Sequence, residues 1–219
     1  MNYAAVGTRP DIAHAVNVLS KFMKNPGQAH WMAAKRVLRY IKGTINKPLV
    51  FNAKGSIVKD QLYVHAYSDA DWAGDVDDRR STTGYVVRIG DSSVIWSTKK
   101  QKTVSLSSAE AEYMALAATT QEVKWVSQFL HELLDVSGMS LCVNMSVYVD
   151  NQAAMLISKN DVYHDRTKHI DIRYHFIRDA IKSGLCKLVW VPTDQQLADG
   201  LTKALSIITF TNLFSTIMC

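Results

Sequence analysis

The spacing of the apolar residues changes once along this chain of 219 residues, and the change limits the folds that it can adopt. Over residues 8–43 the apolar side chains recur at helical spacing, with Pro10 in a first turn. From residue 62 onward the apolar residues fall in short, strand-like segments. We therefore expect an N-terminal helical hairpin, a boundary at residues 52–61 and then a domain that contains a sheet.

The order of the later elements predicts the kind of sheet. The sequence predicts strands at 62–69, 81–90 and 92–100, a long helix at 107–134, a strand at 146–150, helices at 151–159 and 168–184, a strand at 185–191 and a helix at 194–205. Three consecutive strands form an antiparallel meander, whereas helices that lead into the last two strands imply parallel pairing. The predicted fold class is α/β, with a mixed five-stranded sheet flanked by helices and with the first strand paired to the fourth.

Charge is distributed unevenly along the chain. Residues 1–60 hold ten Lys and Arg against two Asp and Glu, whereas residues 61–219 hold 15 against 18. The first part therefore has the composition of a surface for a polyanion, although solvated helix faces would give the same count.

The cysteines and the apolar runs indicate the cellular compartment in which the protein is expected. Cys142, Cys186 and Cys219 are odd in number, far apart and without a CxxC spacing, which favours a reducing environment without disulfides. The first residues do not match a signal peptide, and no apolar run approaches the roughly 18 residues of a membrane span. We expect an intracellular protein of the cytoplasm or nucleus that is not secreted.

Four acidic residues fall at the ends of strands or the starts of helices. Asp69 ends the first strand and Asp150 ends the fourth, so parallel pairing of these strands would place them side by side. Glu112 lies in the first turns of the long helix, and Asp199 lies near the start of the last helix. Converging carboxylates repel one another unless cations neutralise them, and Mg²⁺ favours such oxygen ligands. Two such ions about 4 Å apart form a phosphoryl-transfer site.

Each of these residues also has a purely structural interpretation. Asp69 can form a turn, and Glu112 can complement a helix dipole. Asp150 and Asp199 can each cap a helix. The order of the four acids and their placement on the elements favour a metal site over four unrelated caps and turns.

Five motifs occur in order along the chain, namely YSDADWAGDVDDRRSTTGY, WSTKKQKTVSLSSAEAEYMAL, VYVDNQAA, RTKHIDIRYHFIRD and WVPTDQQLADGLTKAL. They resemble the ribonuclease H domain of copia-type retrotransposon Pol polyproteins. The preceding segment, TRPDIAHAVNVLSKFMKNPGQAHWMAAKRVLRYIKGT, is similar to the tail of the reverse transcriptase in such polyproteins. Together they imply a reverse transcriptase tail at 1–55, a ribonuclease H domain at 60–205 and an irregular C-terminal tail at 206–219.

The resemblance implies a ribonuclease H-like fold and hydrolysis of the RNA strand of RNA–DNA hybrids during retrotransposon reverse transcription. It implies that the catalytic and metal-binding residues are Asp69, Glu112, Asp150 and Asp199, with two Mg²⁺ ions for which Mn²⁺ can substitute. Asp69 would bridge both ions, Glu112 and Asp150 would hold the ion at the leaving 3′ oxygen, and Asp199 would help to hold the other. Glu110 and Asp71 are left with a capping and a turn or supporting role. The expected partners are the hybrid and the reverse transcriptase portion of the polyprotein, with no membrane and no small-molecule cofactor.

Two groups of basic residues are candidates for phosphate contacts, against the alternative that they are solvated surface. One group surrounds the predicted meander and contains Arg79, Arg80, Lys99, Lys100 and Lys102. The other surrounds the penultimate helix and contains Arg166, Lys168, His169, Arg173 and His175.

Other functions fit the sequence less well. A zinc site from His164, His169, His175 and Cys186 has the wrong spacing. A polymerase is disfavoured because YVDN lacks a second acid, and an integrase is disfavoured because the acids run Asp, Glu, Asp, Asp. Residues 191–198 lack the histidine that bacterial ribonucleases H place before the last acid. The remaining alternative is a catalytically silent transposon remnant that acts at most as a nucleic-acid-binding module.

Overall fold

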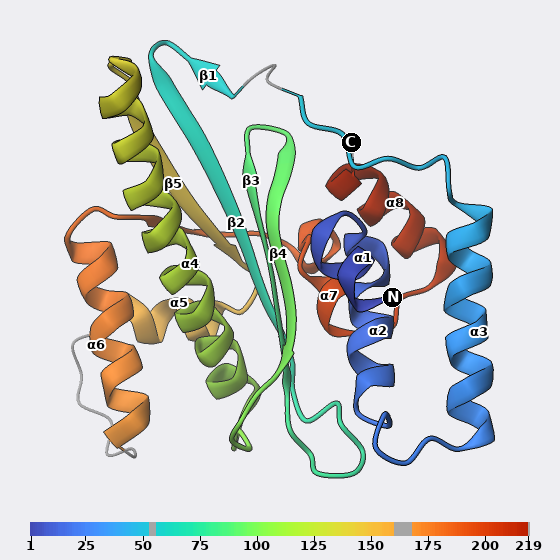
Figure 1. Ribbon diagram of the computed structural model, residues 1–219. Helices are drawn as coiled ribbons and strands as arrows, with labels where there is room; N and C mark the ends of the chain where they lie inside the picture. The colour runs from blue at the N-terminus through green and yellow to red at the C-terminus, as the bar shows by residue number, and fades with distance from the viewer. Residues whose placement is uncertain (53–55, 160–167, 219) are drawn as a thin grey trace.

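The computed structural model describes residues 1–52, 56–159 and 168–218. At its centre is a six-stranded sheet in which the order is β4-β3-β2-β5-β6, with β1 beside β2 (Figure 1). The strands are β1 (Ile57–Val58), β2 (Gln61–Asp71), β3 (Thr82–Ile89), β4 (Ser92–Lys100), β5 (Cys142–Val149) and β6 (Lys187–Trp190).

The strand directions follow the predicted scheme. β2 pairs with β3, and β3 with β4, in antiparallel fashion, whereas β2 with β5 and β5 with β6 are parallel. The predicted mixed α/β sheet is therefore confirmed. The short β1, which pairs with the start of β2, lies in the predicted boundary and was not expected.

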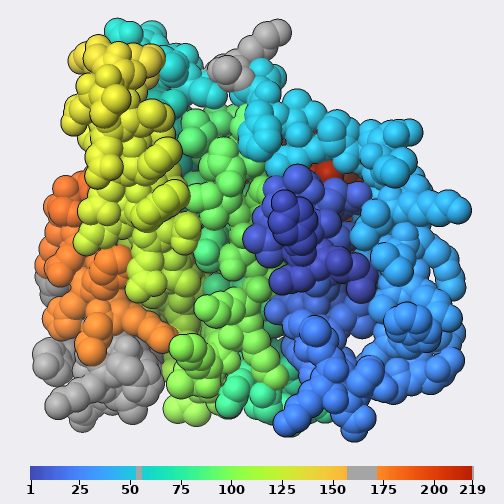
Figure 2. Space-filling view, viewed as in Figure 1, coloured from blue at the N-terminus to red at the C-terminus, as the bar shows by residue number. Residues whose placement is uncertain are grey.

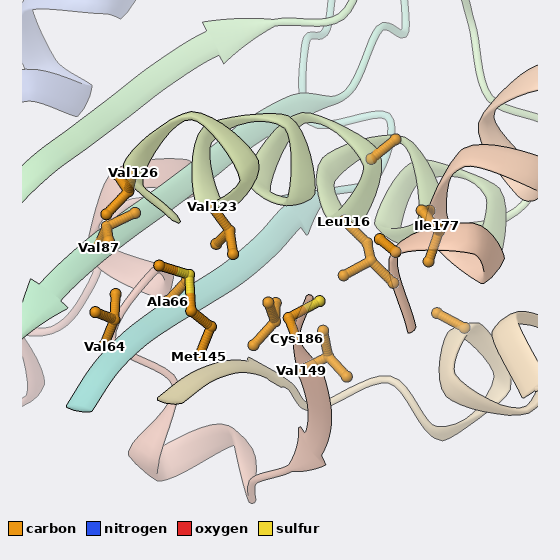
Figure 3. Packing of buried hydrophobic residues seen from close by; sticks show 14 of the residues in the cluster. Val64, Ala66, Val87, Leu116, Val123, Val126, Met145, Val149, Ile177 and Cys186 are labelled. Atoms are coloured by element: carbon orange, nitrogen blue, oxygen red, sulfur yellow. The ribbon is translucent and has the colours of Figure 1, made fainter. Parts of the chain in front are cut away.

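One face of the sheet is covered by α4 (Ser108–Ser137), with α5 (Gln152–Lys159) and α6 (Lys168–Lys182) beside it (Figure 1). Successive side chains of a strand point to opposite faces, so Val64 and Ala66 of β2 share this face. They pack with Leu116 and Val123 of α4 in the main hydrophobic core (Figure 3). The long helix is thus fixed along most of its length by the centre of the sheet.

Short elements from both ends of the chain cover the opposite face (Figure 1). From the N-terminal part come α1 (Asn2–Gly7), η1 (Pro10–Ile12) and α2 (Ala13–Ser20), and α3 (Gln28–Gly43) packs on α2 from the outside (Figure 1). From the C-terminal part come η2 (Thr193–Gln195), α7 (Asp199–Thr202) and α8 (Ile207–Met218). A second hydrophobic cluster joins the two parts, because Ala13 of α2 packs with Val86 of β3 and with Leu201 and Phe214.

Polar contacts also hold the N-terminal helices against the rest of the chain. The Trp96 indole N–H of β4 donates to the Ala5 carbonyl at 2.7 Å, and the Val50 N–H donates to the Met218 carbonyl at 2.8 Å. In the space-filling view α1 and α2 form one continuous surface with β4 (Figure 2). The division of the chain into separate domains at residues 55 and 60 stays a prediction.

Two C-terminal segments differ from the sequence-based expectation. The tail at 206–219 was expected to be irregular, yet Ile207–Met218 form α8. Its apolar, Thr- and Ser-rich sequence becomes helical because tertiary packing buries one side of it. The helix expected at 194–205 is reduced to η2 and the four residues of α7.

No helix among the described residues is long and apolar enough to cross a membrane.

The C-terminal helix offers a matched test of its role in the core. Ile217 is fully buried, whereas Ile208, on the same helix, is 75% exposed. Ile217→Ala should lower the free energy of unfolding by about 2–5 kcal/mol, because it leaves a cavity, and Ile208→Ala should change it by less than about 0.5 kcal/mol. Urea unfolding followed by circular dichroism measures both, and equal effects would show that α8 does not belong to the core.

Candidate metal centre

Asp69 and Asp150 are brought together by the pairing of β2 with β5. The parallel ladder ends at the pair Tyr67–Tyr148, and each aspartate comes two residues after its member of that pair. Because side chains alternate along a strand, both carboxylates lie on the face that carries Tyr67 and Tyr148, whose rings stack at 4.7 Å. That face is the one covered by α7 and α8.

The third carboxylate reaches the same place from α7. Asp199 is the first residue of this helix, and α7 packs on β3 and β2. Carboxylate oxygens of Asp69, Asp150 and Asp199 all lie within 4.8 Å of one another. Asp69 and Asp199 are buried, and Asp150 is half-buried.

Gly84 allows α7 to approach the sheet this closely. It lies opposite Asp69 in the β2–β3 ladder. A Cβ atom at this position would lie 2.5 Å from the Thr202 methyl carbon and 3.0 Å from the Leu201 Cβ. The glycine therefore sets the distance between α7 and the strand that carries Asp69.

Glu112 joins the three aspartates from the opposite side of the sheet edge. It lies near the start of α4, which Ser107 caps by accepting a 3.2 Å hydrogen bond from the Glu110 N–H. Burial, followed by the charges of Asp69 and Asp150, raises the pKa of Glu112 to about 10. The four acids therefore act on one another electrostatically, although Glu112 is not one of the three whose oxygens lie within 4.8 Å.

Asp69 and Asp199 are subject to the same effects of burial and neighbouring negative charge. Burial raises the pKa of Asp69, and burial together with the charge of Asp69 raises the pKa of Asp199 to about 7. Asp199 also keeps one oxygen, Oδ1, that is buried and has no hydrogen-bond partner among the described residues.

Three neighbouring side chains partly offset the negative charge. The Thr202 hydroxyl donates to Asp69, and the Thr193 hydroxyl donates to Asp150 at 2.9 Å. Lys203 Nζ lies 2.9 Å from Asp199 Oδ2. Burial works to lower the pKa of Lys203, but the charges of Asp69 and Asp199 outweigh it and the pKa is raised.

The donor set fits a hard divalent cation. Three close carboxylates offer only oxygen ligands, which is the preference of Mg²⁺. The unpartnered buried oxygen of Asp199 is an acceptor that a cation would satisfy. One lysine cannot neutralise four carboxylates, so the site retains negative charge for a further cation.

Comparison with known proteins places this arrangement in a family. The chain is 48% identical over 205 residues to the "Retrovirus-related Pol polyprotein from transposon RE2" of Arabidopsis thaliana, which covers 94% of this chain and 14% of that protein. It is 46% identical over 201 residues to the corresponding Pol polyprotein from transposon TNT 1-94 of Nicotiana tabacum, which covers 92% of this chain and 14% of that one. Its homologues are retrovirus-related Pol polyproteins of transposons. It spans about one seventh of the length of these relatives.

Two other comparisons add little. No protein-family model matches the chain. Among solved structures, an LC11-RNase H1 in complex with an RNA/DNA hybrid is 14% identical and has a TM-score of 0.46, with 64% of this chain and 93% of that chain covered. A TM-score of this size is too low to carry an argument.

Asp71, the second acid of the SDAD motif, is not among the three aspartates whose oxygens lie within 4.8 Å of one another. Burial raises its pKa, while the charges of Lys203, His14 and Lys21 act in the opposite direction. Its carboxylate lies so close to Gly74 that a side chain at that position would collide with it. Asp71 thus supports the turn after β2.

The basic residues around the meander differ in their freedom to bind phosphate. Arg79, Lys99 and Lys102 are exposed. Lys100 Nζ instead lies 2.6 Å from Asp75 Oδ2 and 2.8 Å from Asp78 Oδ2. Asp75 also accepts from Lys21 at 2.7 Å, so this cluster joins the loop after β2 to the N-terminal helices.

Arg80 is less free than its exposed neighbours, because its Nε lies 3.5 Å from Asp78 Oδ2. In the second basic group Arg173 is half-buried and His175 is exposed. Arg166 lies outside the described residues, as do the side chains of Lys168 and His169.

Sequence reasoning missed the residues that support the carboxylates, namely Thr193, Gln196, Thr202 and Lys203. Lys203 follows Asp199 by four residues, a spacing that brings side chains together on a helix, and this signal was available. Thr193 and Gln196 lie around a short 3-10 turn, where no periodicity identifies them.

Gly84→Ala should disturb the arrangement of the three aspartates, although Gly84 is not itself one of the site residues. The added methyl group would overpack the contact between β3 and α7, which costs about 1–3 kcal/mol of stability, and would move Asp199 away from Asp69. The chain offers a control in Gly43, where an added Cβ meets nothing within 4 Å. Divalent-ion titration calorimetry and urea unfolding should show losses for Gly84→Ala and none for Gly43→Ala.

The raised pKa of Glu112 predicts a pH dependence of stability in EDTA. The folded protein keeps a proton on Glu112 up to about pH 10, whereas the unfolded chain releases it near 4.5. Between these values the folded state binds more protons, so the free energy of unfolding falls as pH rises. Glu112→Gln should match the wild type at pH 4 and be more stable by at least about 1 kcal/mol at pH 8. Mg²⁺ should stabilise the wild type at pH 8, and a stability difference that is independent of pH would contradict the prediction.

Proposed function

We propose that this chain is the ribonuclease H part of a transposon Pol polyprotein, a metal-dependent endonuclease that hydrolyses the RNA strand of RNA–DNA hybrids. The observation that carries the proposal is the meeting of Asp69, Asp150 and Asp199, with oxygens within 4.8 Å, beside Glu112. The similarity of nearly the whole chain to transposon Pol polyproteins supports it.

In this proposal the four acids hold two Mg²⁺ ions, or Mn²⁺ in their place. Asp69, which is 3% exposed, would bind both ions. Glu112 and Asp150 would hold the ion that serves the leaving 3′ oxygen, and Asp199 would help to hold the ion that serves the attacking water. Ions bound in such a pair lower the pKa of water and stabilise charge on the leaving oxygen.

The surrounding side chains keep the carboxylates in place for this reaction. The hydroxyls of Thr202 and Thr193 each fix one oxygen of an aspartate, which leaves the other oxygens for cations. The Lys203 ammonium contacts Asp199 Oδ2 and holds this carboxylate in place. Thr193 lies in η2, before Asp199, whereas Thr202 and Lys203 lie at the end of α7, after it. Segments on both sides of the last acid therefore order the site.

Exposed cations supply the contact with the substrate backbone. Arg79, Lys99 and Lys102 lie around the ends of β3 and β4, next to the strand end that carries Asp69. Phosphate contacts of this kind give affinity without sequence preference. Discrimination for RNA would come from contacts with 2′-hydroxyls in the minor groove.

The second candidate function is a silent nucleic-acid-binding module. It is favoured by the same exposed cations, which would bind a hybrid whether or not the acids were active. The two functions differ in what carboxylate substitutions do, because only the enzyme depends on them.

Asp69→Asn and Glu112→Gln should each reduce hydrolysis of a labelled RNA–DNA hybrid in Mg²⁺ by at least about a hundredfold, because a lost ligand removes several kcal/mol of transition-state stabilisation. Hybrid binding, measured by fluorescence anisotropy in Ca²⁺, should be retained. Glu132→Gln, on the exposed side of the same helix as Glu112, is the control and should cleave like the wild type. Binding by the wild type without any cleavage would favour the silent module.

A further inference from the structure

Beyond the four acids, one buried amide joins the elements that carry them. The β2–β5 ladder ends at Tyr67–Tyr148, and Gln196 inserts its side chain where the two strands part. We propose that Gln196 is a positioning residue that sets the spacing of Asp69, Asp150 and Asp199 for divalent-cation binding. This inference rests on the proposed function, since the spacing matters for cations that the acids hold.

The nitrogen of the amide spans the two strands. Gln196 Nε2 donates to the Ser68 carbonyl at 3.0 Å and to the Tyr148 carbonyl at 3.5 Å. An amide nitrogen carries two hydrogens, so it can serve both acceptors. Ser68 directly precedes Asp69, and Tyr148 lies two residues before Asp150. One side chain thus takes the place of ladder hydrogen bonds at the point where the acids begin.

The oxygen of the same amide holds Ala198, the residue before the third acid. Gln196 Oε1 accepts from the Ala198 N–H at 3.2 Å, and the Gln196 carbonyl accepts from the Asp199 N–H at 3.2 Å. The start of α7 is therefore fixed to the same group that joins β2 and β5. Gln196 is 1% exposed, so water does not compete for these bonds.

The chemistry of the position requires an amide. The two strand carbonyls require two hydrogen-bond donors, and the N–H group at the start of α7 requires one acceptor. Only an amide in this orientation provides both. A carboxylate of the same shape would set an acceptor against two carbonyls and add charge beside three carboxylates. An apolar side chain of similar length would fill the space but leave buried polar groups without partners.

The fourth acid has a comparable support from a second buried glutamine. Gln101 Nε2 donates to the Ala111 carbonyl, which precedes Glu112, and to the Thr83 hydroxyl, each at 3.0 Å. This amide ties the first turn of α4 to β3. Its hydrogen bonds go to Thr83, Ala111 and Ser105, whereas those to Ser68 and Tyr148 come from Gln196.

The test uses the whole chain, Mn²⁺ alone as the probe, and titration by electron paramagnetic resonance. Gln196→Met keeps the side-chain length and removes all three side-chain hydrogen bonds. It should weaken Mn²⁺ binding at least tenfold, and the Mg²⁺ concentration for half-maximal hydrolysis should rise by a similar factor while KM for the hybrid stays the same. Val123→Ala is the control for lost stability, because Val123 is fully buried in α4, eleven residues or about 16 Å from Glu112 along the helix. It should bind Mn²⁺ like the wild type.

A measurement on the wild type covers the case in which Gln196→Met does not fold. In ¹⁵N-labelled protein the Gln196 side-chain amide hydrogens should exchange much more slowly than those of exposed glutamines, and their signals should shift when Mg²⁺ is added. Unprotected amide hydrogens, or unchanged Mn²⁺ affinity in folded Gln196→Met, would overturn the role of Gln196. Absence of Mn²⁺ binding in the wild type would instead overturn the proposed function.

Discussion

Repulsion between buried carboxylates is the constraint on which the rest of this structure depends. Three aspartates place oxygens within 4.8 Å of one another where two parallel strands part, and Glu112 adds its charge from the other side of the sheet edge. Charges this close and this poorly hydrated destabilise a fold unless protons or cations neutralise them. The two threonine hydroxyls and Lys203 reduce this repulsion. They do not remove it, because the pKa of Asp199 is still raised.

The arrangement persists because rigid elements on both faces hold it. α4 is fixed by the main core over most of its length, which fixes Glu112. α7 has only four residues and could not stay in place alone, so it relies on α8 and α2 behind it and on the absence of a side chain at Gly84 in front. The carboxylate site is therefore supported both by α8, which follows α7 directly, and by α2, which is distant in sequence.

Much of this could be predicted from the sequence, because the signals were local or ordered. Strand order followed from the succession of apolar segments, and the meeting of Asp69 with Asp150 followed from parallel pairing. The helix α8 was missed because it forms through burial of Phe214 and Ile217, which its sequence does not reveal. Gln196 was missed because a polar residue beside a short turn shows no period. The ion pairs of Lys100 depend on a loop conformation that composition cannot give.

The joining of α2 with α7 and α8 has a consequence for how the chain folds. Contacts of α2 with α7 and α8 join segments that are far apart in sequence, and such distant pairings are slow to form. On the ribosome α2 emerges before α7 and α8 and must wait for these partners. The face of α2 that packs with Leu201 and Phe214 in the folded chain, which includes Ala13, is exposed during that interval. The nascent chain should depend on chaperones until α8 has left the exit tunnel, because exposed apolar surface of this kind promotes aggregation.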